Sequence, residues 1–231
     1  MAEEEGGQPF QFTPEGGKPG NSSRDYTGRG LAQYPNNDQY DGYYADGVRN
    51  GKGKYAYANE DKYDGEFRNN RKHGIGRLTY KDKGEYYGQW ENGLKHGEGT
   101  YTYANKDTYS GWWQFGKKHG KGNYTYSDTG MRLIGEWKEN KIVQGRWIFP
   151  NGTYFEGDFE NNKPTKNGTW HFKDGNHLDG VYQQTIIPNE DPVQFRCNAG
   201  RQKTQHQVGM EQSKRHLRIG KSGQRTRELL T

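Results

Sequence analysis

Three histidines recur at equal spacing and are the first residues that could do chemistry. His73, His96 and His119 each stand directly before a glycine. Histidine is a common zinc ligand, but all ligands of one zinc ion lie about 2 Å from it. If each repeat unit is a β-hairpin, equivalent residues are two strands apart, which is roughly 9.5 Å. We therefore predict no metal site, and we expect the three rings to lie in turns and donate to backbone carbonyls.

Two further patterns resemble cofactor-binding or catalytic motifs. Gly-x-Gly triplets such as Gly74-Ile75-Gly76 would suit a phosphate-binding loop only if a helix followed them, and none is expected here. Paired carboxylates such as Asp64 and Glu66 fall on one solvated strand face, without an apolar pocket to separate their pKa values. The sequence therefore predicts no catalytic residue, no cofactor and no enzymatic activity.

These residues belong to a sequence repeat, which predicts the elements that position them. A Tyr-x-Gly triplet occurs four times with a period of 23, and related triplets continue the series. An aromatic residue stands two positions after each of these glycines. The triplets begin at Tyr40, Tyr63, Tyr86, Tyr109, Leu133, Phe155 and Leu178. A register kept over so many copies indicates a repeat architecture.

Each unit predicts one β-hairpin with an aromatic face and a polar face. Alternation places Tyr63 and Phe67 on one face of a strand and Asp64 and Glu66 on the other. Polar turn residues follow at 69–72. A glycine on the aromatic face leaves its backbone bare, so a ring of a neighbouring strand can lie over it.

The composition favours thin β-structure. The 231 residues include 35 Gly, 18 Tyr and 6 Trp, whereas aliphatic residues are scarce. This argues against a helical bundle and a Rossmann-type enzyme, and no apolar stretch approaches the roughly 18 residues of a membrane-spanning helix. The predicted fold class is all-β, a single-layer antiparallel meander of β-hairpins with extended tails.

The repeat resembles a known family. Residues 86–103, Tyr-Tyr-Gly-Gln-Trp-Glu-Asn-Gly-Leu-Lys-His-Gly-Glu-Gly-Thr-Tyr-Thr-Tyr, are similar to the MORN repeat, and the resemblance covers six full units and a partial one at each end. It implies a scaffolding or docking array. Units five and six depart from the pattern, because Ile142-Val143 and Thr165-Lys166 stand where His-Gly would be. MORN-bearing enzymes carry catalytic domains far longer than either flank here, so a regulatory fragment would need a separate catalytic chain.

The chain is expected to divide into three segments. These are an extended or disordered N-terminal segment at 1–24, the array at 25–182 and a basic extended tail at 183–231. The tail carries the whole net charge of +5. The acidic N-terminus does not resemble a secretory signal, and the one cysteine, Cys197, suits a reducing compartment. We expect a cytoplasmic location.

Residues 105–112 and 119–137 are similar to the radial spoke head MORN proteins of motile cilia and flagella. The insertion 127–130, Ser-Asp-Thr-Gly, lengthens one repeat step by a residue and is part of this likeness. The resemblance implies a structural subunit of the axonemal spoke head, bound to other spoke head proteins, to a second MORN subunit or to itself. The long acidic tail of the animal members is missing.

The aromatic face is the first candidate surface for such partners. A single-layer sheet buries only part of its rings, and a long exposed apolar face usually marks an interaction surface. In the alternative, the rings pack only on each other and on the tails. The candidate residues are Tyr40, Tyr44, Tyr63, Phe67, Tyr86, Trp90, Tyr109, Trp113, Trp137 and Phe159.

The basic tail is the second candidate. It could be a solvated segment, an arm that lies on acidic partner proteins, or a phospholipid-binding segment. The candidate contacts are Arg201, Lys203, Lys214, Arg215 and Arg218. No aromatic residues alternate with these cations, so nucleic acid binding is not expected. The alternative function is a peripheral membrane adaptor that binds acidic phospholipids through the array and the tail, although the tail lacks the apolar face of an interfacial helix.

Overall fold

A computed structural model describes residues 9–185, 194–199 and 217–218 of the chain. All regular elements among these residues are β-strands. The chain divides into two compact units, residues 1–141 and 142–231. The predicted all-β fold class is confirmed.

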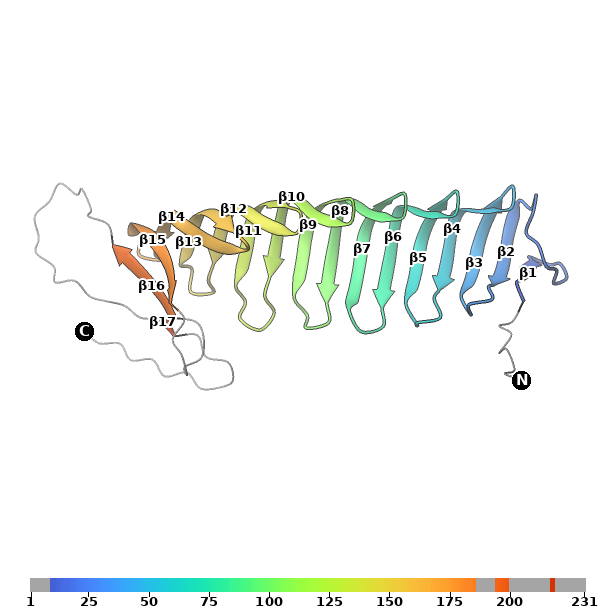
Figure 1. The fold of residues 1–231 in the computed structure, drawn as a ribbon, viewed down its shortest axis with the longest axis horizontal. Coiled ribbons are helices and arrows are strands. Elements are labelled where there is room, and N and C mark those ends of the chain that lie inside the picture. Colours follow the sequence, from blue (N-terminus) through green and yellow to red (C-terminus); the bar gives the residue numbers. More distant parts are fainter. Residues whose placement is uncertain (1–8, 186–193, 200–216, 219–231) are drawn as a thin grey trace, which may run out of the picture. The chain divides into compact units, whose positions relative to one another are not determined.

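The first unit is an antiparallel meander in which each strand pairs with the next along the chain (Figure 1). Its strands are β1 (Gln11–Pro14), β2 (Gly28–Gln33), β3 (Gln39–Ala45), β4 (Val48–Ala56), β5 (Lys62–Arg68), β6 (Arg71–Tyr80), β7 (Gly84–Glu91), β8 (Leu94–Tyr103), β9 (Thr108–Gln114), β10 (Lys117–Thr125) and β11 (Arg132–Lys138).

The second unit continues the same pattern of neighbouring antiparallel strands. Its strands are β12 (Lys141–Ile148, which starts on the last residue of the first unit), β13 (Tyr154–Glu160), β14 (Lys163–His171), β15 (His177–Thr185), β16 (Gln194–Ala199) and β17 (Leu217–Arg218).

The hairpin tips are two-residue turns. Asn69 and Asn70 have φ angles of 47° and 66°, and Asn92 and Gly93 have 50° and 85°. Two consecutive positive φ angles define the type I′ turn, whose twist matches that of the flanking strands. The turn expected at 69–72 is therefore shorter, because the left-handed angles of two residues suffice to reverse the chain.

Each tip is bonded to the preceding repeat unit. The Asn70 amide donates to the Arg49 carbonyl at 3.0 Å, and the Arg49 amide donates to Asn70 Oδ1 at 2.9 Å. The amides of Gly93 and Gly116 donate in the same way to the carbonyls of Lys72 and Lys95, both at 2.9 Å. The tips of consecutive units are thereby fixed to one another.

A bulge bends the hairpins β3–β4, β5–β6, β7–β8, β9–β10 and β13–β14 below their tips. In β5 and β6 the register runs from Gly65↔Gly76 directly to Glu66↔His73, which leaves extra residues in β6. Gly74, with φ of 58°, lies in this bend and has a backbone conformation that residues other than glycine rarely adopt. The tips curl over as a result (Figure 1).

The rings lie over glycines, as the sequence predicted. A Cβ atom at Gly99 would lie 2.6 Å from Cζ of Tyr86, so the ring of β7 occupies the space that a side chain of β8 would need. The Tyr86 hydroxyl donates to the carbonyl of Gln89, at 2.9 Å, where the bulge interrupts the ladder. Tyr40, Tyr63 and Tyr109 make the equivalent bond.

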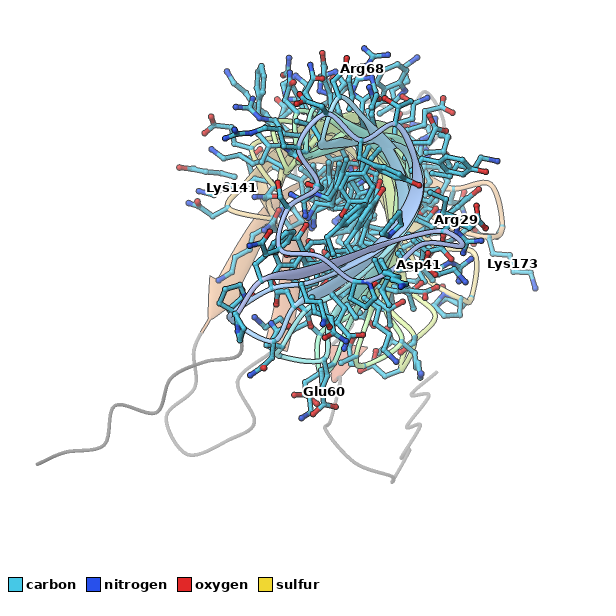
Figure 2. All side chains as sticks on the ribbon, turned by 90° about the vertical axis from the view of Figure 1, so that its right-hand side faces the viewer. Arg29, Asp41, Glu60, Arg68, Lys141 and Lys173 are labelled. Atoms are coloured by element: carbon cyan, nitrogen blue, oxygen red, sulfur yellow. The ribbon has the colours of Figure 1, made fainter. Side chains whose placement is uncertain are left out.

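Indole groups connect one repeat unit to the next. Nε1 of Trp90 donates to the carbonyl of Gly76 at 3.0 Å, and Nε1 of Trp113 donates to that of Gly99 at 3.1 Å. The rings of Tyr86 and Trp113 meet edge to face with centroids 5.3 Å apart. In Figure 2, carbon-rich side chains fill the middle, and the charged residues Arg29, Glu60 and Arg68 lie at the periphery.

In one unit a different side chain donates the hydrogen bond at the bulge. Phe155 replaces the tyrosine and cannot donate, and the hydroxyl of Thr165 donates to the carbonyl of Asp158 instead, at 3.1 Å. Asp158 stands three residues after Phe155, as Gln89 does after Tyr86. The departure of Thr165 from the repeat pattern thus supplies the hydroxyl that Phe155 lacks.

The predicted segment boundaries need correction at both ends. Residues 9–24 do not lie outside the array: β1 pairs with β2, and Phe12 is buried, with its ring over Gly30. The sequence Gln-Phe-Thr-Pro carries no repeat signature, which is why the boundary was placed too late. At the other end, β15 extends to Thr185 and pairs with β16, so the sheet continues into the segment predicted as a tail.

Buried carboxylates fix the long turns between repeat units. Asp107 accepts bonds from the Tyr124 hydroxyl at 2.7 Å and the Ser127 amide at 2.8 Å, and Asp38 does the same with Tyr55 and Ala58. Burial by itself would raise the pKa of Asp107, but these hydrogen bonds outweigh it and lower the pKa. The folded state therefore stabilises the ionised form of the Asp107 carboxyl group.

We expect Gly99→Ala to lower the free energy of unfolding by about 1–3 kcal/mol, because the added methyl group overlaps a ring that cannot move. Urea unfolding followed by tryptophan fluorescence measures the change. Gly20→Ala is the matched control, since nothing lies within 4 Å of a Cβ atom there and it should stay within about 0.5 kcal/mol of wild type. Equal effects at the two positions would contradict ring-over-glycine packing.

We expect the protein to lose stability as the pH falls below about 4. The folded-state pKa of Asp38 and Asp107 is lowered, so their contribution is present above the unfolded pKa of about 3.9 and is lost as the pH falls through the folded values. Urea midpoints between pH 6 and pH 3 test this. Asp107→Asn should be less stable at pH 6 and should show a smaller loss on acidification; an unchanged pH profile would argue against the assignment.

Candidate interaction surface

A ladder of cations lies on the aromatic face of the first unit. Arg49, Lys72, Lys95 and Lys118 recur with the period of the repeat, and each is half-buried. We call Lys72, Lys95 and Lys118 the lysine ladder. Sequence reasoning missed it, although its regular spacing was available as a signal.

Strand register explains why these lysines reach the aromatic face. Directly opposite residues of neighbouring antiparallel strands point to the same face. Lys72 is opposite Phe67, and Lys95 is opposite Trp90. Because the second residue of each pair is a buried ring, the lysine opposite must also point inward, past the bend in the hairpin.

Each ammonium group is surrounded by rings. Nζ of Lys95 lies 4.6 Å from the ring centroid of Tyr101, 4.7 Å from that of Trp113 and 5.4 Å from that of Tyr86. These distances are within the range of cation–π attraction. Lys72 contacts Tyr57, Tyr63 and Trp90 in the same way, and Lys118 contacts Tyr103, Tyr109, Tyr124 and Trp137.

A row of half-buried tyrosines runs beside the ladder. Nζ of Lys72 lies 3.4 Å from the Tyr57 hydroxyl, and Nζ of Lys118 lies 3.4 Å from that of Tyr103. These rings stand four residues after the second glycine of each Gly-x-Gly triplet and keep the period of the repeat. We call Tyr57, Tyr80, Tyr103 and Tyr126 the tyrosine row.

The environment disfavours the charge on the ladder. Burial lowers the pKa of Lys95 to about 8, and the neighbouring charges of Lys72 and Lys118 contribute to this shift. Burial also lowers the pKa of Lys118 to about 8. Within the described part of the chain, no ion pair joins these three lysines to a carboxylate.

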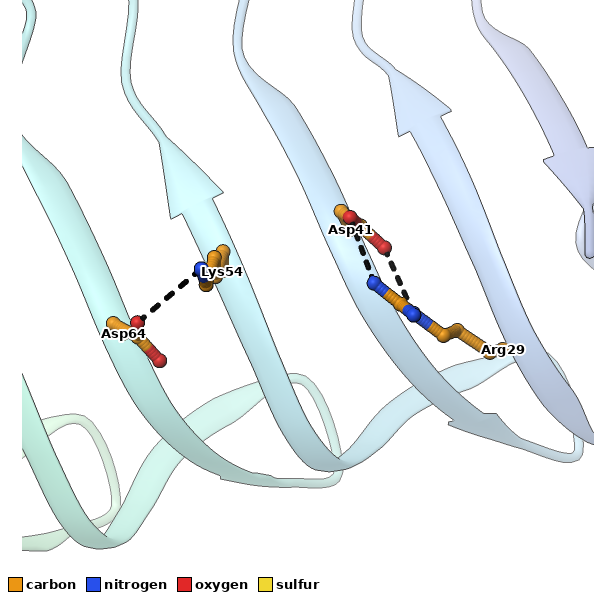
Figure 3. Close-up of polar contacts among 4 residues, drawn as sticks. All are labelled: Arg29, Asp41, Lys54 and Asp64. Atoms are coloured by element: carbon orange, nitrogen blue, oxygen red, sulfur yellow. Dashed lines mark hydrogen bonds and ion pairs between the residues drawn. The ribbon is translucent and has the colours of Figure 1, made fainter.

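The opposite face of the sheet differs in this respect. Arg29 forms two hydrogen bonds with Asp41, and Nζ of Lys54 lies 3.8 Å from Oδ2 of Asp64 (Figure 3). Asp64 is thus on the polar face, as predicted. Exposed pairs of this kind add little stability. Arg29 and Lys54 on the outer face thus have carboxylate partners, which distinguishes them from the lysine ladder.

The ten predicted aromatic residues are buried, and the expectation that they are only partly buried is wrong. None is more than 5% exposed, because the curled tips and the neighbouring rings cover them. That the aromatic face contacts a partner stays a prediction, and the half-buried ladder and tyrosine row are the groups available for it. The buried residues are Tyr40, Tyr44, Tyr63, Phe67, Tyr86, Trp90, Tyr109, Trp113, Trp137 and Phe159.

The predicted tail contacts are not tested by this structure. Arg201, Lys203, Lys214 and Arg215 lie outside the described residues, and only the backbone of Arg218 is described, in β17.

The three histidines lie in strands and not in turns, which corrects the prediction. His73 belongs to β6 and pairs with Glu66, and Nε2 of His96 lies 3.3 Å from Oε2 of Glu91. The turns are only two residues long, so His73 falls beyond the reversal. In the described ranges no group of three or more potential metal ligands occurs. The same ranges contain no helix long and apolar enough to span a membrane.

One hairpin tip carries an exposed ring under strain. Phe115 has a φ of 49°, which a bulky residue rarely adopts, and 68% of its surface is exposed. Asp46, Asn69, Asn92 and Asn161 fill the same turn position in other units. A strained, exposed aromatic residue among polar equivalents is a candidate contact with another molecule.

The repeat matches a known family model. The family model described as MORN repeat matches residues 40–62, 63–85, 86–108, 109–131, 134–154 and 155–177. Among solved structures, the chain is similar to the TCP domain of SAS-4 (dCPAP) from Drosophila melanogaster, a structure with a proline-rich motif of Ana2 (dSTIL). The TM-score is 0.42 and the identity 16%, over 65% of this chain and 82% of that one. No curated protein matches closely enough to be reported as a relative.

We expect the free energy of unfolding to rise between about pH 8 and pH 9.5. The pKa of Lys95 and Lys118 is about 8 in the folded state and about 10.4 in the unfolded state, so the unfolded chain binds more protons in this range. Above about pH 10 the trend should reverse, because burial raises the pKa of tyrosines such as Tyr103 to about 12.

Urea unfolding at pH 7.5, 8.5 and 9.5 measures this dependence. The double variant Lys95→Met, Lys118→Met should show a flatter profile, and the exposed pair Lys52→Met, Lys121→Met serves as the control that keeps the wild-type slope. If both double variants kept that slope, the ladder would not be the source of the dependence.

Proposed function

The chain belongs to the MORN-repeat family, whose arrays are protein-interaction or membrane-binding scaffolds, and on this premise we propose that it is a structural subunit of the axonemal radial spoke head. In this role it docks neighbouring spoke head proteins, a second MORN subunit or another copy of itself, and it supports ciliary motility. Its location is then the cytoplasm, within the cytoskeleton of the cilium or flagellum. The likeness of residues 105–112 and 119–137 to spoke head MORN proteins motivates the specific assignment.

The observation that carries the docking role is the lysine ladder. Three half-buried cations at regular spacing lie among rings and have no carboxylate in the described residues to pair with. Burial lowers the pKa of Lys95 and Lys118, so the site disfavours their charge even though rings and a tyrosine hydroxyl contact it. A scaffold that receives an anionic group from a partner accounts for the arrangement, whereas a merely structural repeat could carry apolar residues there.

The described polar groups fit the same role. Asp64 forms an ion pair on the outer face, Asp107 is bonded in a turn, and the described residues contain no group of three or more potential metal ligands. The matching family is not a catalytic one. We therefore propose a non-enzymatic subunit without a cofactor.

The alternative proposal is a peripheral membrane adaptor. The net charge of +5 in residues 183–231 is the observation that favours it, because anionic lipid surfaces attract basic segments. Co-sedimentation with anionic vesicles tests it: binding that falls with salt and vanishes on deletion of 183–231 would support the adaptor over the spoke head subunit.

We expect cilia that lack this protein to have incomplete spoke heads and abnormal beating, because neighbouring subunits lose their platform. Electron cryotomography of axonemes and high-speed video of beating provide the two measurements. Re-expression of the wild-type chain is the control and should restore both. Complete spoke heads with normal beating in the deletion strain would contradict the proposal.

A further inference from the structure

We propose that the lysine ladder and the tyrosine row bind an acidic polyproline-II segment of a partner protein, with a carboxylate at every third residue. The inference rests on the proposed docking role, and it adds the conformation and charge spacing of the ligand. The two rows lie side by side, as the bonds of Lys72 to Tyr57 and of Lys118 to Tyr103 show.

The charge of the lysine ladder favours an anionic ligand. Its three ammonium groups repel one another and are withdrawn from water. Rings surround them, and no described carboxylate forms an ion pair with them, although the charge of Asp61 acts on Lys72. Arg49, the fourth cation in the series, is already engaged, since its guanidinium donates to Oδ1 and to the carbonyl of Asn70. The sites left for a ligand are therefore Lys72, Lys95 and Lys118. A carboxylate at each would form a charge-assisted hydrogen bond.

The spacing of the ladder selects the conformation. Successive lysines are two strands apart, which is about 9.5 Å. A polyproline-II helix has three residues per turn and rises about 3.1 Å per residue, so side chains at i and i+3 point the same way about 9.3 Å apart. Over the two intervals of the ladder, the mismatch is below about 1 Å.

Other conformations match less well. In a β-strand, residues on one face lie about 6.7 Å apart, and residues three apart point to opposite faces. In an α-helix, side chains three or four residues apart share a face at about 5–6 Å, and the repeat nearest to about 9.5 Å is seven residues, or about 10.5 Å, which drifts by about 20° per heptad. Only the polyproline-II helix meets both the distance and the direction.

The tyrosine row suits the same ligand. Polyproline-II segments dock on rows of aromatic side chains, and their backbone carbonyls have no internal hydrogen-bond partners. Tyr57, Tyr80, Tyr103 and Tyr126 offer half-buried rings and hydroxyls at the same spacing as the lysines. A carboxylate on the ladder and prolines on the tyrosine row would then be held by one surface.

The test is binding of labelled peptides to the full chain, measured by fluorescence anisotropy. One peptide is six repeats of Glu-Pro-Pro, and a second has the same composition with all glutamates in one block. We expect the periodic peptide to bind at least fivefold more tightly, and its affinity to fall with salt. Equal affinities for the two peptides, or no binding of the periodic one, would overturn the proposal.

Variants locate the site. We expect the affinity for the periodic peptide to fall about fivefold in each of the variants Lys72→Met, Lys95→Met and Lys118→Met. Lys95→Arg should keep most of the affinity because it keeps the charge. Lys52→Met and Lys121→Met, both on the exposed outer face, remove the same charge and should leave binding unchanged. Thermal unfolding confirms that each variant is folded, so lost binding is not lost structure. A uniform loss in all five Met variants would contradict the assigned site.

Two outcomes separate this inference from the spoke head proposal. If the deletion strain lacks spoke heads but the peptides do not bind, the scaffold role stands and the ligand assignment is wrong. If the chain binds vesicles with anionic phosphatidylserine through the ladder and ignores the peptides, the ladder serves a lipid headgroup, and the protein-ligand proposal is overturned.

Discussion

The packing of an aromatic ring over a backbone glycine is the contact on which the rest of this structure depends. Tyr86 covers Gly99, and the equivalent tyrosines repeat the contact in the neighbouring units. Because the glycine has no side chain, the ring lies close enough for its hydroxyl to reach the carbonyl that the bulge leaves free. The contact therefore holds the bend of the hairpin in place and also packs the aromatic face. A sheet with few aliphatic residues obtains its core in this way, and Phe12 extends the same device to the first strand.

The bend connects this packing to the candidate site. It turns the tips over the rings, buries the aromatic face and brings Lys72, Lys95 and Lys118 inward in three of the units, from the residues just beyond the turn. Phe67 and Lys72 illustrate the sequence of causes, since the register that buries the ring also buries the cation opposite it. The same strand register and bend therefore produce both the aromatic core and the proposed binding surface.

The period and alternation of residues were enough to predict the all-β hairpin array, the two faces and the rings over glycines. The burial of the rings was not predictable in this way, because it depends on the curl of the tips, and alternation describes straight strands. The lysine ladder was missed for the same reason: Lys72 stands in a polar stretch that looks like a solvated turn. Thr165 looked like a defect of the pattern, and its hydroxyl proves to replace the one absent from Phe155.

The hydrogen bonds between tips give the array a direction. Asn70 holds the backbone of Arg49, and Gly93 holds that of Lys72, so each repeat is completed by the one that follows it. Loss or duplication of a whole repeat module leaves every such junction intact and changes only the number of rungs. Loss of a few residues within a strand instead breaks one junction, whereas the long turns between units absorb small changes: after the insertion at 127–130, Trp137 still donates to Gly122 and Phe155 still covers Gly168. The number of rungs therefore changes only by whole modules, and the length of ligand that the array measures changes in the same steps.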